Sequence, residues 1–240
     1  MLIVQKYGGT SVGDAARVRA AAGRIAEAYL LGHDVVAVLS AQGDTTDELL
    51  SLAAELNPSP PKRELDMLLA TGEQRSVALM AICLARMGIP AVSLTGRQAG
   101  VRTDAAHGAA RIRRVDTSRI RRELGRRRVV LVAGFQGADD ADDVTTLGRG
   151  GSDTTAVALA AALGAARCQI FTDVDGVYTS DPRRDPAAKK YASISFDDML
   201  ALCHGGAQVL MDRSVELARR TGTRIEVLSA LRRAPGTTVG

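Results

Sequence analysis

The fold is decided where the chain reads Leu2-Ile3-Val4-Gln5-Lys6-Tyr7-Gly8-Gly9-Thr10-Ser11-Val12-Gly13. The β-branched residues at its start predict a strand, and the paired glycines and hydroxyl residues predict a turn into a helix. Such a loop suits phosphate oxygens, because Lys6 carries a positive charge and the N–H groups of Gly8 and Gly9 can approach a ligand closely. The alternative is a glycine turn beside an exposed lysine. Neither GxxxxGK[ST] nor GxGxxG occurs in the chain, so a P-loop or Rossmann nucleotide site loses its main support.

The rest of the chain repeats this alternation of strand and helix. After the first strand, apolar residues recur at helical spacing between Val18 and Tyr29, with Asp14 at the start of the helix and Gly32 at its end. Apolar strands separated by helices predict a mostly parallel sheet covered on both faces, with ligand sites at the carboxyl ends of the strands. Further strands are predicted at 35–39, 91–94, 129–132, 169–171 and 225–228.

Length and composition indicate a globular protein with one large α/β domain or two small ones. The chain has 240 residues, of which 46% are hydrophobic and 24% charged, a balance typical of soluble domains. Its first residues lack the basic segment and long apolar core of a signal peptide, and no membrane span is predicted. Three widely spaced cysteines without a CxxC pair favour a reduced, cytoplasmic location.

Two charged runs have an ordinary interpretation. The net charge of +4 comes largely from arginines in residues 111–128, which we interpret as a solvated helix face and not a nucleic-acid surface, because the chain has no Trp and few aromatic residues for base stacking. The acidic run Asp139-Asp140-Ala141-Asp142-Asp143 could indicate a metal site. An exposed hairpin tip is favoured, because carboxylates at a polar turn need no ligand.

A second glycine-rich loop reads Gly148-Arg149-Gly150-Gly151-Ser152-Asp153-Thr154-Thr155 and runs into an apolar helix. The free N–H groups of a helix start capped by Ser152 or Asp153, together with the planar guanidinium of Arg149, suit a carboxylate or a phosphate. An ordinary strand-to-helix turn is the alternative, because glycine-rich turns are common.

Two other loops carry polar groups whose roles the spacing leaves open. Ser40 and Thr46 follow the second strand and can donate to a small polar substrate or cap the next helix. Thr71 and Gln74 have capping-box spacing. Glu73 between them could bind a substrate ammonium, or it could interact only with the positive end of its own helix.

The loop after the strand at 169–171 has the chemistry of a nucleotide pocket. Thr172 and Asp173 offer a hydroxyl and a carboxylate, Tyr178 offers a packing surface, and Arg183 offers a cation for phosphate. A calcium loop is excluded, because the oxygen ligand at the fifth position and the terminal glutamate are missing.

In combination, these motifs resemble the aspartate kinases. The resemblance covers the chain in order and rests on residues 6–12, 39–49, 69–74, 93–100, 148–155 and 172–178. It implies the amino acid kinase fold, a three-layer α/β/α arrangement around a mainly parallel eight-stranded sheet, with residues 1–240 forming one catalytic domain. The implied reaction transfers the γ-phosphate of ATP, with Mg²⁺ present, to the β-carboxylate of L-aspartate or a close analogue, in a homodimer.

The resemblance also implies a role for each loop residue. Lys6 and Asp153 would serve catalysis, and no general base is required because a carboxylate is already a nucleophile. Mg²⁺ would be held chiefly by ATP phosphates and water. The implied amino-acid site consists of Ser40, Thr46, Glu73, Arg149 and Ser152, and the implied ATP site consists of Lys6, Gly8, Gly9, Ser11, Thr172, Asp173, Tyr178, Arg183 and Gln208.

The chain departs from the family pattern at two places. Gln208 stands where the family has a lysine that reaches the ATP phosphates, and loss of such a cation costs about two powers of ten in rate unless a nearby arginine compensates. Alternative functions are therefore a kinase for another acidic amino acid or metabolite, and a nucleotide-binding subunit with little turnover. The family usually continues into ACT regulatory domains, which are not expected within these 240 residues. A separate regulatory chain is one alternative.

Overall fold

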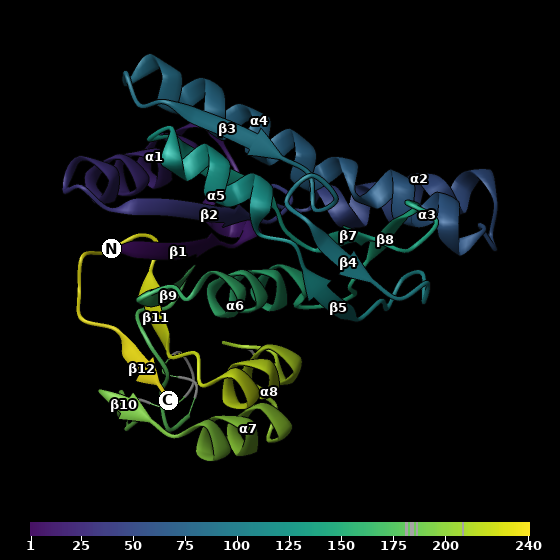
Figure 1. Ribbon diagram of the computed structural model, residues 1–240. Helices are drawn as coiled ribbons and strands as arrows, with labels where there is room; N and C mark the ends of the chain where they lie inside the picture. The colour runs from purple at the N-terminus through teal and green to yellow at the C-terminus, as the bar shows by residue number, and fades with distance from the viewer. Residues whose placement is uncertain (181, 183–184, 186, 208) are drawn as a thin grey trace.

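The computed structural model describes residues 1–180, 182, 185, 187–207 and 209–240, and strands and helices alternate along them (Figure 1). The strands are β1 (Leu2–Tyr7), β2 (Asp34–Leu39), β3 (Ala91–Leu94), β4 (Val101–Thr103), β5 (Ile112–Val115), β6 (Val129–Ala133), β7 (Gln136–Ala138), β8 (Val144–Thr146), β9 (Arg167–Thr172), β10 (Ser193–Ile194), β11 (Ile225–Ser229) and β12 (Thr237–Val239). The helices are η1 (Gly9–Ser11), α1 (Ala15–Leu30), α2 (Thr45–Leu56), α3 (Lys62–Leu69), α4 (Thr71–Arg86), α5 (Ser118–Gly125), α6 (Gly151–Leu163), α7 (Phe196–His204) and α8 (Asp212–Thr221).

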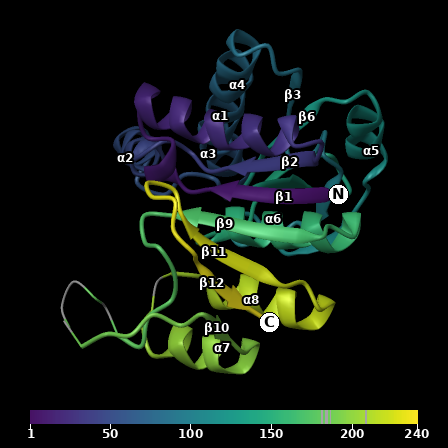
Figure 2. The ribbon, with the colours of Figure 1, turned by 90° about the vertical axis from the view of Figure 1, so that its left-hand side faces the viewer.

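The main sheet has eight strands in the order β10-β12-β11-β9-β1-β2-β6-β3. All neighbouring strands are parallel except β11 and β12. In Figure 2, β2, β1, β9, β11, β12 and β10 follow one another down the picture. Every strand predicted from an apolar run forms, and the mainly parallel eight-stranded sheet is confirmed.

Helices cover both faces of this sheet, which confirms the three-layer prediction. Val36 and Val38 of β2 belong to the core on the side of α5, α6, α7 and α8. Val35, Ala37 and Leu39 belong to the core on the side of α1 and α4. Alternate residues of one strand are thus buried on opposite faces, because successive side chains of a strand point to opposite sides.

A second, four-stranded sheet in the order β5-β4-β7-β8 was not predicted. It also changes the interpretation of the arginine-rich run 111–128, whose first part is the strand β5 and not a helix face. The helix α5 follows, and its buried Glu123 accepts bonds from Arg119 (2.8 Å) and Arg128 (3.2 Å). Several of these arginines therefore neutralise one buried carboxylate in addition to facing solvent.

The acidic run forms the predicted hairpin, because β7 and β8 pair antiparallel on either side of it. Asp139 is nevertheless buried, and its carboxylate accepts the N–H groups of Ala141 and Asp143. Asp143 pairs with Arg63 at 2.6 Å. One ligand atom each of Asp139, Asp143 and His107 lies within 4.8 Å of the others, but the two carboxylates already have partners. The turn therefore has a sufficient structural explanation.

The predicted capping box at the start of α4 is wrong. Ala70 has helical dihedral angles and joins α3 to α4, so the helical run continues through it. The Thr71 hydroxyl donates to the carbonyl of Leu68 and does not cap a helix start. Among the described residues, the run Lys62–Arg86 is the one helix long and apolar enough to cross a membrane by length and composition. In this fold α4 covers the sheet at β3 and β6.

The loops that follow β1, β2 and β9 lie close together because β1 is the central strand of the three. This strand lies between β2 and β9, and the register places Tyr7 opposite both Leu39 and Phe171. Because these strands are parallel, their following loops leave the same edge of the sheet. Ligands of such sheets bind at this edge, where the connections diverge to the two faces.

Candidate active site

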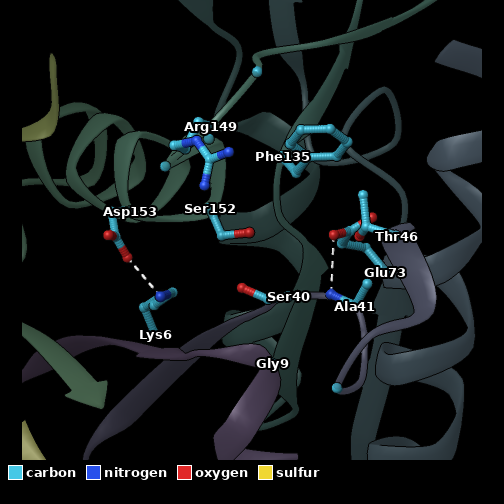
Figure 3. Close-up of a pocket in the computed structure, with 14 residues that line it drawn as sticks. Lys6, Gly9, Ser40, Ala41, Thr46, Glu73, Phe135, Arg149, Ser152 and Asp153 are labelled. Atoms are coloured by element: carbon cyan, nitrogen blue, oxygen red, sulfur yellow. Dashed lines mark hydrogen bonds and ion pairs between the residues drawn. The ribbon is translucent and has the colours of Figure 1, made fainter. Parts of the chain in front are cut away.

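A pocket of about 280 Å³ lies at the carboxyl ends of β1 and β2 and the start of α6 (Figure 3). It brings together residues from five separate parts of the sequence. It also contains groups of both charges, namely two cations and two carboxylates. The lining residues are Lys6, Gly9, Ser40, Ala41, Gly43, Thr46, Glu73, Phe135, Gly148, Arg149, Gly150, Gly151, Ser152 and Asp153.

Lys6 and Asp153 form an ion pair on one side of this pocket (Figure 3). The Lys6 Nζ lies 2.6 Å from Asp153 Oδ1, and the two side chains are 12% and 10% exposed. Lys6 is at the end of β1, and Asp153 is in the first turn of α6. Each charge compensates the other in a site where an isolated charge would be costly. An incoming phosphate would therefore meet an ordered ammonium group.

The loop before α6 turns on glycines. Gly148 and Gly150 have φ of 73° and 72°, in the left-handed region that favours glycine. Gly150 is the residue that precedes the helix, and no side chain caps it. The prediction that Ser152 or Asp153 caps the helix is therefore wrong; both lie inside its first turn. Gly151, Ser152 and Asp153 of this first turn line the pocket, and the N–H groups at a helix start suit an anion.

Arg149 lies between these two glycines and is exposed. Figure 3 shows its side chain above Ser152 at the mouth of the pocket, with Glu73 on the side of the pocket away from Lys6 and Asp153. A planar guanidinium can bind both oxygens of a carboxylate. The predicted pairing of Arg149, Ser152 and Glu73 in one site is thus geometrically possible.

Glu73 is a buried carboxylate, 3% exposed, in α4. Its Oε1 accepts the N–H of Ala41 at 2.9 Å. Its Oε2 has no hydrogen-bond partner among the described residues. Burial raises the pKa of Glu73 to about 7, because the charged form loses its hydration. A ligand ammonium would supply the missing partner for the second oxygen.

The remaining predicted acceptor residues also line this pocket. Ser40 follows β2, and its N–H donates to the carbonyl of Tyr7 at 3.1 Å. Thr46 lies in the first turn of α2. Gly9 is essential to the shape, since a Cβ there would lie 2.7 Å from the carbonyl oxygen of Ala41. These three residues complete the lining of the pocket beside its charged groups.

Phe135 follows β6 and lines the pocket, although no sequence pattern indicated it as a site residue. Its φ is 66°, although it is not a glycine, and such a conformation persists only when the surroundings hold it. Two hydrogen bonds hold this backbone: the Phe135 N–H donates to Thr155 Oγ1 at 3.2 Å, and the Phe135 carbonyl accepts the Leu147 N–H at 2.8 Å. The only available signal was its position after a buried strand.

A second pocket, of about 630 Å³, lies beside the loop after β9. Thr172, Asp173 and Tyr178 line it, as the sequence predicts. The Tyr178 hydroxyl donates to Asp175 at 2.8 Å, which raises the pKa of Tyr178 and lowers that of Asp175. Residues 205–207 and 209 form the opposite wall. Arg183 and Gln208 lie outside the described residues.

Lys6 lines the first pocket and lies close to the backbone that leads into the second. Its Nζ lies 3.4 Å from the position that a Cβ of Gly8 would take, and the Gly8 N–H donates to the Phe171 carbonyl at 3.4 Å. Phe171 is followed directly by Thr172 of the second pocket. Gly8 and Ser11 line neither pocket. Ser11 Oγ is buried without a partner among the described residues.

The arrangement suits a transfer between two ligands. The first pocket offers a cation and a carboxylate for a small zwitterion. The second pocket is larger and polar, as a nucleotide requires. The lysine of the first pocket can neutralise charge that develops on a transferring phosphoryl group.

Comparison with known proteins agrees with this geometry. Residues 1–229 match the family model described as the amino acid kinase family. The chain is 53% identical over 238 residues to an aspartokinase of Bacillus sp. strain MGA3, covering 99% of this chain and 58% of that protein. The crystal structure of aspartate kinase from Synechocystis matches with a TM-score of 0.89 and 46% identity, over 100% of this chain and 39% of that chain.

The structure of E. coli aspartokinase III in complex with aspartate and ADP matches with a TM-score of 0.87 and 28% identity, over 100% of this chain and 64% of that chain. This chain thus spans less than two thirds of the length of each of these relatives. The match to the family model covers nearly the whole sequence, and the fold is that of the aspartate kinase structures. The chain therefore belongs to the amino acid kinase family.

Proposed function

We propose that this chain phosphorylates the β-carboxylate of L-aspartate with ATP and gives 4-phospho-L-aspartate. One observation carries the proposal: Arg149 and Glu73 line the same small pocket as Lys6. A cation and a carboxylate in one pocket complement the carboxylate and ammonium of an amino acid, and Lys6 lies where the phosphate would enter. The similarity to aspartokinases supports the choice of acceptor.

The pocket charges suggest one orientation for the acceptor. The α-ammonium binds the unpartnered Oε2 of Glu73, and the α-carboxylate binds Arg149. Ser40, Thr46 and Ser152 line the pocket between these ends and are available to bind the rest of the molecule. The β-carboxylate is then directed toward Lys6. In this orientation both ionic groups of the substrate contribute to binding.

ATP occupies the second pocket in this proposal. Thr172, Asp173 and Tyr178 surround the nucleoside, and the phosphates extend toward Lys6. The Gly9 N–H and the hydroxyl of Ser11, which is buried without a partner among the described residues, are assigned to the phosphates, whereas the Gly8 N–H would first have to give up its bond to the Phe171 carbonyl. The proposed contacts of Arg183 and Gln208 with ATP rest on the sequence alone.

Mg²⁺ fits this site as part of the nucleotide complex. Of the two carboxylates that line the first pocket, Asp153 is paired with Lys6 and Glu73 binds the Ala41 N–H. A small hard cation prefers several oxygen ligands and gives up its water reluctantly. We therefore expect the ATP phosphates and water to supply most of its ligands, and the ion to neutralise phosphate charge.

The transfer requires alignment and charge neutralisation. An oxygen of the β-carboxylate attacks the γ-phosphorus, the bond between that phosphorus and its bridging oxygen breaks, and ADP leaves with the electron pair. No proton is transferred, so none of the described histidines is needed. Lys6, oriented by Asp153, and the N–H groups at the start of α6 stabilise the negative charge of the phosphoryl group in the transition state.

The direct test is an acceptor screen. Purified protein is incubated with ATP, Mg²⁺ and hydroxylamine, which converts an acyl phosphate to a hydroxamate. L-Aspartate should give a hydroxamate together with stoichiometric ADP. Turnover of another acidic amino acid or metabolite without turnover of L-aspartate would replace the proposed acceptor. Binding of ADP without turnover of any acceptor would favour a nucleotide-binding subunit.

We also propose that residues 1–240 act as one catalytic domain and that the protein is a cytoplasmic homodimer. Ile82 of α4 is 68% exposed, which is compatible with a covered face in an assembly. The three cysteines are free thiols, as in a reducing compartment. Light scattering should give twice the chain mass of 25.2 kDa, whereas a single chain mass would refute the dimer. A separate regulatory chain stays a prediction.

A further inference from the structure

The start of α8 contacts the loop that carries Arg149. Arg213, in the first turn of α8, donates from Nη1 to the carbonyl of Leu147 at 2.8 Å and from Nη2 to the carbonyl of Ala110 at 3.2 Å. Both acceptors are main-chain atoms. Hydrogen bonds from a charged donor are stronger than neutral ones, so this side chain fixes the backbone immediately before Gly148.

Met211 makes a second contact with the same loop. It is the residue that precedes α8. A Cβ at Gly150 would lie 2.2 Å from Met211 Cγ and 2.6 Å from Met211 Cβ. The methionine side chain therefore packs directly against the α-carbon of Gly150. Leu147 and Gly150, on either side of the turn, are thus both held by the segment that begins α8.

The turn between these contacts needs external support. The Leu147 N–H donates to Phe135, and the Gly151 N–H donates to Gly148. The two glycines of the turn have left-handed φ, and glycine loses more conformational freedom on ordering than any other residue. Arg149 between them is exposed. The direction of its guanidinium thus depends on how firmly the turn is fixed.

We propose that Arg213 and Met211 are positioning residues, which fix the 148–150 turn so that Arg149 points into the acceptor pocket. This inference rests on the proposed function, because it assigns Arg149 to the acceptor. The same segment continues backward into residues 205–207 and 209, which line the second pocket. One stretch of chain therefore lines the nucleotide pocket and holds the acceptor loop.

Hydrogen exchange tests the positioning without any substrate. In Arg213→Ala, the amides of residues 147–151 should exchange at least about tenfold faster than in the wild-type protein, while the amides of β1 and β2 keep their rates. Arg220→Ala is the matched control, because Arg220 is exposed on the same helix and touches no loop residue named here. Unchanged exchange in residues 147–151 of a folded Arg213→Ala protein would overturn the proposal.

Kinetics then separate positioning from general destabilisation. The KM for L-aspartate of Arg213→Ala should rise at least about tenfold, with the KM for ATP within twofold, and Arg213→Lys should fall between that variant and the wild type. Met211→Ala should also raise the KM for L-aspartate, but less than Arg213→Ala does, and should leave the KM for ATP within twofold. Equal rises in both KM values, or faster exchange with an unchanged KM for L-aspartate, would refute a positioning role. If wild type does not turn over L-aspartate, the proposed function fails, and the exchange result alone decides whether Arg213 holds the turn.

Discussion

The two pockets of this protein are built in different ways. The acceptor pocket is small, and three of its four charged groups, Lys6, Glu73 and Asp153, come from β1, α4 and the start of α6, where each is fixed by an ion pair or a main-chain hydrogen bond. The nucleotide pocket is more than twice as large and is lined by the loop after β9 and the segment after α7. Regular elements hold most of the charged groups of the first pocket, and loops form most of the second.

The difference indicates where specificity is concentrated. In the acceptor pocket, few buried charges each contribute a large share of the binding, because a buried charge without its partner is costly. In the nucleotide pocket, the contacts are distributed over more residues and more solvent. Single substitutions should therefore have large effects in the first pocket and small effects in the second.

The largest effect is expected at Lys6, which lines the acceptor pocket and is paired with Asp153. Lys6→Ala should lower kcat about a thousandfold, because it removes a cation at the phosphoryl group and leaves Asp153 unpaired. The KM for L-aspartate should change much less. Steady-state kinetics with a coupled ADP assay measure both constants.

Thermal unfolding must accompany this measurement, because loss of the Lys6–Asp153 pair also affects stability. Lys62→Ala is a suitable control, since Lys62 is exposed at the start of α3. A folded Lys6→Ala protein with kcat within tenfold of the wild type would contradict the assignment of Lys6 to the transfer.

A smaller effect, dependent on pH, is expected at Glu73, whose pKa is raised by burial to about 7. Binding of the substrate ammonium needs the ionised carboxylate, so the KM for L-aspartate should rise about tenfold as the pH falls from 8 to 6. Glu73→Gln should have a higher KM that is flat over this range. A pH-dependent KM that persists in Glu73→Gln would show that another group is titrating. The exposed Glu55 of α2 provides the control Glu55→Gln.

The same group makes a prediction about stability. A carboxyl whose pKa is higher in the folded than in the unfolded protein stabilises the fold most at low pH, and this contribution is lost as the pH rises from about 4.5 to about 7. Glu73→Gln keeps an acceptor for the Ala41 N–H and cannot ionise. Its Tm relative to wild type should therefore be more favourable at pH 8 than at pH 5. An equal difference at both pH values would contradict the raised pKa.

The smallest effect is expected in the nucleotide pocket. Tyr178→Ala should raise the KM for ATP about fivefold and leave the KM for L-aspartate unchanged, because the remaining contacts still hold the nucleotide. Tyr178→Phe keeps the ring and loses only the hydroxyl bond to Asp175, so it should remain within about twofold of wild type. A loss as large as that expected for Lys6 would remove the distinction between the two pockets.

Local sequence patterns predicted the main sheet well. Buried parallel strands appear as short apolar runs, and these runs identified β1, β2, β3, β6, β9 and β11. They did not reveal β4, which has three residues and little apolar periodicity, and β7 was expected only as one side of the acidic hairpin. The capping box at Thr71 failed because Ala70 adopts a helical conformation, so the spacing was correct but the helix did not begin there.

The sequence also predicted most of the first pocket, because its residues lie in loops at the carboxyl ends of strands. It could not predict the Lys6–Asp153 pair, which joins residues far apart in the chain, or the unusual backbone of Phe135. The roles of Arg213 and Met211 were also hidden. Both act on the backbone of a distant loop, and such contacts leave no local pattern in the sequence.

The central claim is that the acceptor pocket has two charged ends, with Arg149 for the α-carboxylate and Glu73 for the α-ammonium. Equilibrium binding of L-aspartate, β-alanine and succinate tests it, because β-alanine lacks the α-carboxylate and succinate lacks the ammonium. Both analogues should bind wild type at least about tenfold more weakly than L-aspartate.

The decisive comparison uses Arg149→Ala, with the exposed Arg86→Ala as the control. Arg149→Ala should bind L-aspartate at least about thirtyfold more weakly than wild type does, because the charge-assisted hydrogen bonds to the α-carboxylate are lost, and should no longer distinguish it from β-alanine. Its preference for L-aspartate over succinate should remain. If Arg149→Ala still prefers L-aspartate to β-alanine by the wild-type ratio, Arg149 does not bind the α-carboxylate and the two-ended site is wrong.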